Sequence, residues 1–199
     1  TLRPAWTLAL PRAGVGFAPA VAGNGVWAAA ADGTVVRVDA ASGRPAWRVT
    51  TGKPLVAGIG TDGETGVVIA ADGEAIAFDA NGNVRWRARV GAEATTVPAV
   101  ALGVALLRTT DNRVIALDAA SGERRWVVSR PNPPLTLRQT GGIAVAPETA
   151  FLGLPGGRMV ALALANGAPR WEISVAQPKG ASEIERIADQ SGKSPRKVK

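Results

Sequence analysis

A unit of about forty residues occurs four times along this 199-residue chain, and each copy ends on a tryptophan. The four tryptophans follow one another at spacings of 39, 40 and 45 residues and are Trp47, Trp86, Trp126 and Trp171. The related segments before them are DGTVVRVDAASGRPAW, DGEAIAFDANGNVRW, DNRVIALDAASGERRW and GGRMVALALANGAPRW. Because a repeat of this length is typical of solenoids, propellers and arrays, the chain is expected to fold as a series of like units.

Each unit divides into short runs in which apolar and polar residues alternate, as in TVVRVD and RVIALD, and this alternation is typical of β-strands. Asp-Gly or a variant of it separates the runs and favours a tight hairpin, because glycine adopts the positive φ of the turn. Four antiparallel strands in one such unit make the blade of a β-propeller, so we predict an all-β fold. The partial propeller is expected at 1–178, with blades near 18–50, 55–90, 96–130 and 137–175 and a further strand at 4–10.

The repeated tryptophans are predicted to be structural. A blade cannot bury both of its faces alone, so neighbouring blades stack around an axis and cover one another. A turn glycine on the next blade leaves room for the flat tryptophan ring. We therefore expect Trp47, Trp86, Trp126 and Trp171 to dock between blades and not to form a ligand platform, and we interpret Trp6 as the end of another unit.

Composition excludes several chemistries. The chain contains no cysteine and no histidine, which rules out disulfides, thiolate zinc sites, cysteine nucleophiles and Ser-His-Asp triads. No apolar run reaches the roughly 18 residues of a membrane span. The net charge is +7, but no basic face with interleaved aromatic residues is present, so no nucleic-acid partner is expected.

Two segments interrupt the repeat, and the first is RPNPPLTLRQTGG at 130–142. Its three prolines favour an extended segment outside a regular sheet. Alternation then places Leu135 and Leu137 on one side, next to Arg138. A small apolar patch with a charged rim is typical of a protein contact. The alternative is that the two leucines begin the innermost strand of the fourth blade and face the core.

The second interruption is QPKGASEIERIADQ at 177–190. Ser182 is a favourable N-cap, and Ile184, Ile187 and Ala188 would share one face of a short helix. This helix either makes a second partner contact or packs on its own propeller. Residues 179–199 are thus predicted to form an inter-blade helix followed by a basic, disordered tail.

These motifs together resemble a known family. The pattern A-x-D-x-x-x-G-x-x-x-W, complete in ALDAASGERRW, is similar to the tryptophan-docking motif of quinoprotein-type eight-bladed propellers. The second unit is one residue short, and Ala163 replaces the aspartate of the fourth. With the LTLR loop and PKGASEIERIAD, the chain resembles the BamB family, lipoproteins of the outer-membrane β-barrel assembly complex. About four of the family's eight blades are present, which corresponds to its N-terminal half.

The resemblance implies a non-enzymatic scaffold on the periplasmic face of the outer membrane of a Gram-negative bacterium. In that family the Leu-x-Leu-Arg loop contacts the POTRA region of the barrel-forming subunit BamA, and this role falls on Leu135, Leu137 and Arg138. Asp189 matches the first of the family's acidic contact residues, whereas the next one is absent. Unfolded outer-membrane proteins are implied as clients, and membrane attachment is implied only through a lipid anchor outside this chain.

A quinoprotein-like dehydrogenase and a ligand-sensing propeller are the alternatives. Quinoprotein dehydrogenases share the blade and hold a calcium ion through carboxylate and amide oxygens. Here the acidic residues recur at equivalent turn positions, whereas a catalytic residue would occur once. They are Asp32, Asp72, Asp111, Asp39, Asp79 and Asp118. We therefore expect no catalytic residue, no metal site and no cofactor.

The number of blades also predicts association. Four blades leave two open blade faces, and large exposed apolar faces rarely persist on a soluble monomer. A homodimer of half-propellers, or an aggregating monomer, is therefore expected. The sequence leaves open whether the chain is a truncation, a frameshifted product or a natural short form.

Overall fold

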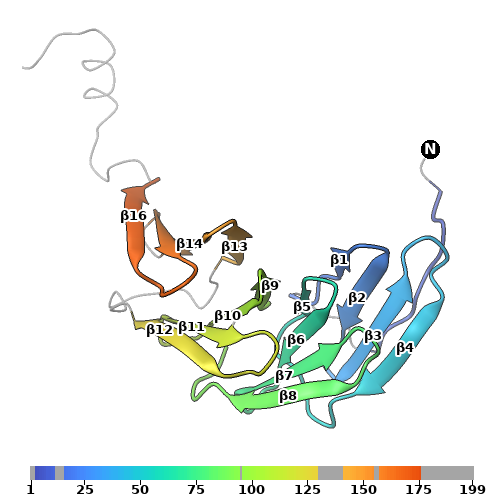
Figure 1. Ribbon diagram of the computed structural model, residues 1–199. Coiled ribbons are helices and arrows are strands. Elements are labelled where there is room, and N and C mark those ends of the chain that lie inside the picture. The colour runs from blue at the N-terminus through green and yellow to red at the C-terminus, as the bar shows by residue number, and fades with distance from the viewer. Residues whose placement is uncertain (1–2, 12–15, 95, 130–140, 155–156, 176–199) are drawn as a thin grey trace, which may run out of the picture.

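The computed structural model describes residues 3–11, 16–94, 96–129, 141–154 and 157–175. Within them the chain forms four antiparallel sheets of four strands each, arranged side by side in an arc (Figure 1). In every sheet the strands follow their order in the sequence. This confirms the prediction of an all-β partial propeller with four-stranded blades. The predicted helix and tail at 179–199 lie outside the described residues.

Within each blade the four strands lie side by side, the first on the inside of the arc and the fourth on its outside. The first two blades contain β1 (Ala20–Ala22), β2 (Gly25–Ala29), β3 (Thr34–Asp39), β4 (Pro45–Thr50), β5 (Gly60–Thr61), β6 (Thr65–Ile69), β7 (Glu74–Asp79) and β8 (Val84–Arg89). The third and fourth contain β9 (Ala99–Ala101), β10 (Val104–Arg108), β11 (Arg113–Asp118), β12 (Arg124–Ser129), β13 (Ile143–Ala146), β14 (Thr149–Leu154), β15 (Arg158–Ala163) and β16 (Pro169–Ser174). The innermost strands of neighbouring blades contact one another.

The hairpins of the blades follow from the turn sequences. Gly33 and Gly73 adopt φ values of 97° and 78° between the second and third strands of their blades, where Asp-Gly favours a tight turn. The ladder between the third and fourth strands shifts register at the same place in every blade, for example between Ala116 and Leu117. Such a bulge increases the local twist of the sheet. The repeated sequence therefore produces the same local geometry four times.

The hydrophobic core lies between the blades. One cluster joins the first blade to the second, a second cluster joins the second blade to the third, and another joins the third to the fourth. The middle strands β6 and β10 are buried along their whole length, because each of them has a neighbouring blade on both faces. Blade stacking is therefore the source of burial in this fold.

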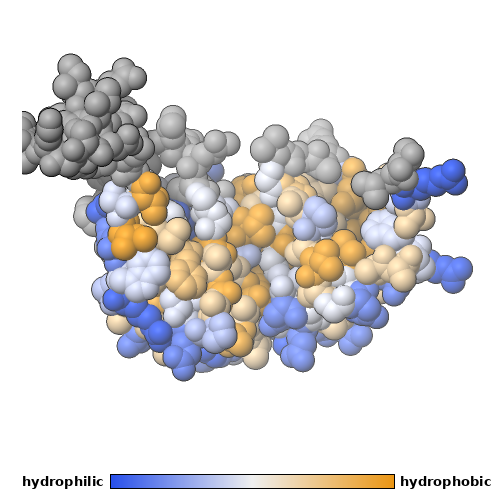
Figure 2. All heavy atoms as spheres, turned by 90° about the horizontal axis from the view of Figure 1, so that it is seen from above, coloured by the Kyte–Doolittle hydropathy of each residue, from blue (hydrophilic) through white to orange (hydrophobic). Residues whose placement is uncertain are grey.

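The concave side of the arc is also apolar. Seen from this side, apolar side chains gather along the middle of the arc (Figure 2). A cavity of about 470 Å³ lies there between the innermost strands and includes Ile59, Val100 and Ile143 in its lining.

The prediction of a strand at 4–10 is wrong, because the structure assigns no strand to these residues. A strand needs a neighbour for its backbone groups, and no described strand pairs with this segment. Side chains hold it instead. Trp6, Leu8 and Leu10 pack against the first blade, and the Trp6 indole donates a hydrogen bond to the Ala40 carbonyl oxygen at 2.9 Å. One of the two blade faces expected to be open is therefore partly covered.

The fourth blade ends the described arc with an exposed outer strand. All six residues of β16 are exposed, including Trp171 at 41% and Ile173 at 49%. The centroid of the Trp171 ring lies 5.8 Å from that of Phe151, which is in β14, two strands away in the same sheet. This blade therefore carries an aromatic and aliphatic surface that no described residue covers from outside.

Candidate partner-binding site

The residues predicted to bind a partner, Leu135, Leu137, Arg138 and Asp189, all lie outside the described residues. Their contacts therefore stay predictions. The structure does describe where the first of the two segments leaves and rejoins the blades. It leaves after β12, which ends at Ser129, and rejoins at Gly141, two residues before β13. The segment thus connects the outer strand of the third blade to the inner strand of the fourth.

A buried arginine contacts the point where this connection rejoins the blades. Arg108 ends β10 and is 1% exposed. Its Nη1 donates to the carbonyl oxygens of Gly153 at 2.7 Å and Gly141 at 3.4 Å, and its Nη2 donates to Oδ1 of Asn112 at 3.3 Å. Burial lowers the pKa of Arg108, because removal from water disfavours the charged form.

Arg108 and Asn112 are not among the residues predicted from the sequence, although the sequence carries a signal for both. Arg108 occupies the register position of Ile69 in the second blade and Ala29 in the first, both of which are buried. Asn112 stands where the first two units have the glycine of Asp-Gly. A charged residue at the end of the otherwise apolar strand β10 is thus a local break in the repeat.

The docking tryptophans meet turn glycines of the following blade. The indoles of Trp47, Trp86 and Trp126 donate to the carbonyl oxygens of Ala80, Ala119 and Leu164 at 2.8, 2.9 and 2.9 Å. A Cβ atom placed on Gly82, Gly122 or Gly167 would lie 2.6 to 2.8 Å from one of these rings. Each ring therefore lies directly on the backbone of the next turn, and three of these tryptophans connect successive blades.

The fourth repeated tryptophan differs from the other three. Trp171 is 41% exposed, whereas Trp86 and Trp126 are 8% and 9% exposed. The described residues contain no turn that follows the fourth blade, so they provide no glycine for Trp171. This position belongs to the exposed surface of β16.

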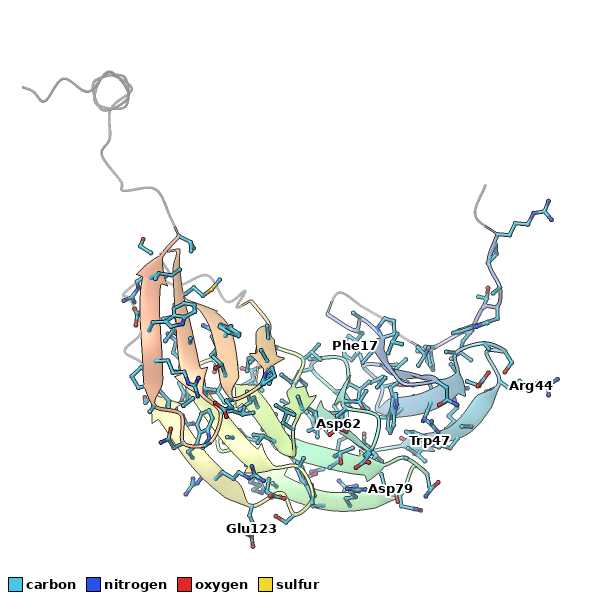
Figure 3. The ribbon with its side chains drawn as sticks, turned by 45° about the horizontal axis from the view of Figure 1, so that its top comes forward. Phe17, Arg44, Trp47, Asp62, Asp79 and Glu123 are labelled. Carbon is cyan, nitrogen blue, oxygen red and sulfur yellow. The ribbon has the colours of Figure 1, made fainter. Side chains whose placement is uncertain are left out.

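The repeated aspartates at the ends of the third strands make turn hydrogen bonds. Figure 3 shows Asp79 of the second blade beside Trp47 of the first. Oδ1 of Asp79 accepts from the amides of Asn81 and Asn83 at 2.8 and 2.9 Å, and Oδ1 of Asp118 accepts from those of Ala120 and Ser121 at 2.9 Å. Asp39 makes the same contact with Ser42. These carboxylates close turns, as their repetition predicts.

Ionic contacts at these turns stabilise the charged carboxylates. The Arg125 guanidinium lies 2.7 Å from Oδ2 of Asp118. Together with the amide of Ser121 it lowers the pKa of Asp118 to about 2. In Asp79 the side chain of Asn83 is the main cause of a lowered pKa. Among the described residues, no group of three or more acidic side chains is arranged to hold a metal ion.

Comparison with known proteins places the chain in a family. A family model described as outer membrane protein assembly factor BamB matches residues 3–63 and 31–196. The chain belongs to the BamB family. It is 42% identical to outer membrane protein assembly factor BamB of Bordetella pertussis over 193 residues, which cover 96% of this chain and 50% of that protein. The protein of the same name from Burkholderia pseudomallei is 38% identical, with 94% and 50% covered. The chain thus spans about half the length of these relatives.

Solved structures agree with this family assignment. The crystal structure of BamB from Moraxella catarrhalis matches with a TM-score of 0.74 at 24% identity and covers 88% of this chain and 54% of that one. Quinohemoprotein alcohol dehydrogenase from Comamonas testosteroni matches with a TM-score of 0.64 at 18% identity, covering 81% and 35%. At such identities the likeness shows a shared fold. The family match and the curated relatives confirm the resemblance to the BamB family that the sequence motifs indicate. In the described residues, no helix is long and apolar enough to cross a membrane.

Proposed function

We propose that this chain is a non-enzymatic scaffold of the outer-membrane protein assembly machinery, and that it binds the POTRA region of BamA through its inter-blade segments. The observation that carries this proposal is the BamB family match over residues 31–196, which includes both segments that interrupt the repeat. Relatives that are 42% and 38% identical are named outer membrane protein assembly factors. A location at the periplasmic face of the outer membrane, with a lipid anchor, follows from the same proposal.

The blades are suited to a scaffold because they fix the ends of the proposed contact loop. Ser129 ends a strand that is paired along its length with β11, and Gly141 accepts a hydrogen bond from Arg108. Between these two points, Leu135, Leu137 and Arg138 would supply an apolar contact with a charged rim, which is the usual anatomy of an interface. Asp189 would add an acidic contact from the second segment. Unfolded outer-membrane proteins are the proposed clients.

The proposal is non-enzymatic because the acidic residues have another role. The carboxylates of Asp39, Asp79 and Asp118 accept hydrogen bonds from the amides of their own turns. The likeness to quinohemoprotein dehydrogenases makes a quinoprotein-like enzyme the alternative. Titration with calcium and pyrroloquinoline quinone, followed by absorbance and dye reduction, separates the two. Saturable quinone binding with dye reduction would contradict the scaffold proposal.

Binding to a purified fragment containing the POTRA domains of BamA tests the proposal directly. Leu137→Ala and Arg138→Ala should each weaken binding by about 1–4 kcal/mol, the usual range for an interface anchor, and should leave the thermal midpoint nearly unchanged. The matched control is Leu102→Ala, which removes a leucine that is 62% exposed in the turn between β9 and β10. This control should bind as the unaltered chain does.

The competing expectation for Leu137 is a core position. Truncation of a buried leucine costs roughly 2–5 kcal/mol of folding stability. A large fall in the thermal midpoint of Leu137→Ala, with binding per folded molecule unaltered, would therefore contradict a contact role. Failure of the unaltered chain to bind the POTRA fragment would contradict the proposed partner.

A further inference from the structure

The Arg108 guanidinium is a buried cation that the packing of the blades does not require. The equivalent positions in the first two blades hold Ala29 and Ile69, both 0% exposed, so an apolar side chain satisfies this position of the blade. In the described structure its hydrogen bonds go to two backbone carbonyl oxygens and to the oxygen of one side-chain amide. A buried charge with neutral acceptors is costly. Its presence calls for a role beyond the filling of space.

The second departure from the repeat is at Asn112, and it is coupled to the first. The amide of Asn112 donates to the Thr109 carbonyl oxygen, as those of Gly33 and Gly73 do to Ala30 and Ala70 in the equivalent turns. Asn112 has a φ of 63°, in the left-handed region that glycine adopts freely and that asparagine adopts more readily than most other residues. Unlike glycine, however, asparagine provides an acceptor for Arg108. Two substitutions peculiar to the third unit thus meet in one hydrogen bond.

The other two acceptors of Arg108 belong to the fourth blade. Gly153 lies in β14, which pairs with β13, and Gly141 lies two residues before β13. Gly141 and Gly142 are exposed, and no heavy atom beyond their chain neighbours lies within 4 Å of where their Cβ atoms would be. Side-chain packing therefore cannot hold Gly141 and Gly142, and the hydrogen bond from Arg108 to the Gly141 carbonyl oxygen holds them instead.

We infer that Arg108 and Asn112 form a clamp that fixes residues 141–142, just before β13, against the third blade and so sets where the 130–142 connection ends. Resting on the proposed function, Arg108 is then a positioning residue for partner binding, since it holds the base of the proposed contact loop without touching the partner. Asn112 orients the guanidinium from the turn between β10 and β11. The two carbonyl oxygens place the fork of the guanidinium between β14 and the start of β13.

Three variants test the clamp. Arg108→Met keeps the length of the side chain and removes its donors. Asn112→Gly removes the acceptor and restores the glycine found in the equivalent turns. The matched control is Arg87→Met, which removes an exposed arginine that pairs with Glu74 at 2.9 Å in the second blade. Hydrogen–deuterium exchange of the amides at 141–143, the affinity for the purified POTRA fragment and the thermal midpoint are measured for each.

Arg108→Met should accelerate exchange at 141–143 about tenfold, the change expected from loss of a hydrogen bond to a charged donor. It should weaken POTRA binding about fivefold or more with a thermal midpoint close to that of the unaltered chain, because replacement of a buried charge by an apolar side chain is often neutral for stability. Asn112→Gly should shift exchange and affinity in the same direction by a smaller factor. Arg108→Lys, which retains a donor, should recover part of the affinity, and Arg87→Met should change neither exchange at 141–143 nor affinity.

The outcomes separate the clamp from the proposed function. If the unaltered chain does not bind the POTRA fragment, the partner is wrong, and the exchange measurement still decides the clamp. If it binds and Leu137→Ala weakens binding, normal exchange and normal affinity in Arg108→Met overturn the clamp. Should Arg108→Met fail to fold, Asn112→Gly decides in its place. Affinity lost only in proportion to the unfolded fraction in either variant also overturns it.

Discussion

Replacement of Trp126 by alanine tests the docking of blades most directly. The Trp126 side chain is 9% exposed in the interface between the third and fourth blades. It packs on Gly167, where a Cβ atom would lie 2.6 Å from the ring, and its indole nitrogen donates to the Leu164 carbonyl oxygen at 2.9 Å. The substitution Trp126→Ala removes both the ring and this hydrogen bond.

The expected loss is about 3–5 kcal/mol of unfolding free energy, the range for truncation of a large buried aromatic residue. That is a large part of the roughly 5–15 kcal/mol that stabilises a typical domain. Trp171→Ala is the matched control, because Trp171 occupies the same place in its unit but is 41% exposed. Its main described ring contact is Phe151, so we expect a loss of about 1 kcal/mol, the value of an aromatic pair.

Denaturation by urea, followed by far-UV circular dichroism, measures both variants without relying on the tryptophan that is removed. Gly167→Ala provides the reciprocal test, because a methyl group there would press into the Trp126 ring at a φ of 73°. It should cost about 1–3 kcal/mol, as overpacking does. Equal losses for Trp126→Ala and Trp171→Ala would refute the docking geometry. A stable, folded Trp126→Ala protein that no longer binds its partner would instead make Trp126 a binding residue.

Two further predictions concern acid and association. The pKa of Asp118 is lowered from 3.8 to about 2, first by Arg125 and then by the Ser121 amide, so its contribution to stability is complete above about pH 4 and is lost as the pH falls through 2. Asp118→Asn should therefore flatten the dependence of the urea midpoint on pH between about 4 and 2, and an unchanged slope would contradict this. The exposed face of β16, with Trp171 and Ile173, should make the 199-residue chain dimerise or associate further at micromolar concentration. Light scattering that gives the monomer mass would show this expectation to be wrong.

The blades could be predicted from the sequence because the same local signals occur four times. Each unit repeats an alternating run, a hairpin turn and a tryptophan at nearly constant spacing, and the strands from Thr34–Asp39 to Arg158–Ala163 begin within a few residues of each predicted turn. Repetition also identified the role of the aspartates. A carboxylate such as that of Asp118, found at the same place in successive units, closes its own turn.

The segment at 4–10 could not be assigned correctly from the same signals. Its tryptophan predicts a strand at the end of a unit, and the ring does dock as the repeat predicts, with the indole of Trp6 bonded to Ala40. Strand formation, however, depends on a neighbour that supplies backbone partners, and that neighbour is not a property of the segment itself. Local sequence therefore specifies the docking of Trp6, whereas pairing depends on the rest of the fold.

Departures from the repeat give information of another kind. A repeated residue serves every blade, so its role is structural, whereas a residue found in one unit serves one place. Arg108 and Asn112 differ from their counterparts at a buried position and at a turn, and the buried charge of Arg108 is by itself unfavourable for folding. Their side chains are nevertheless hydrogen-bonded to each other, and Arg108 also donates to the carbonyl oxygens of Gly141, just before β13, and Gly153, in β14. Two changes in the same unit that meet beside a connection of unusual sequence are best explained by the position of that connection. The exchange rate at 141–143 in Arg108→Met therefore decides whether the third unit departs from the repeat in order to hold the loop.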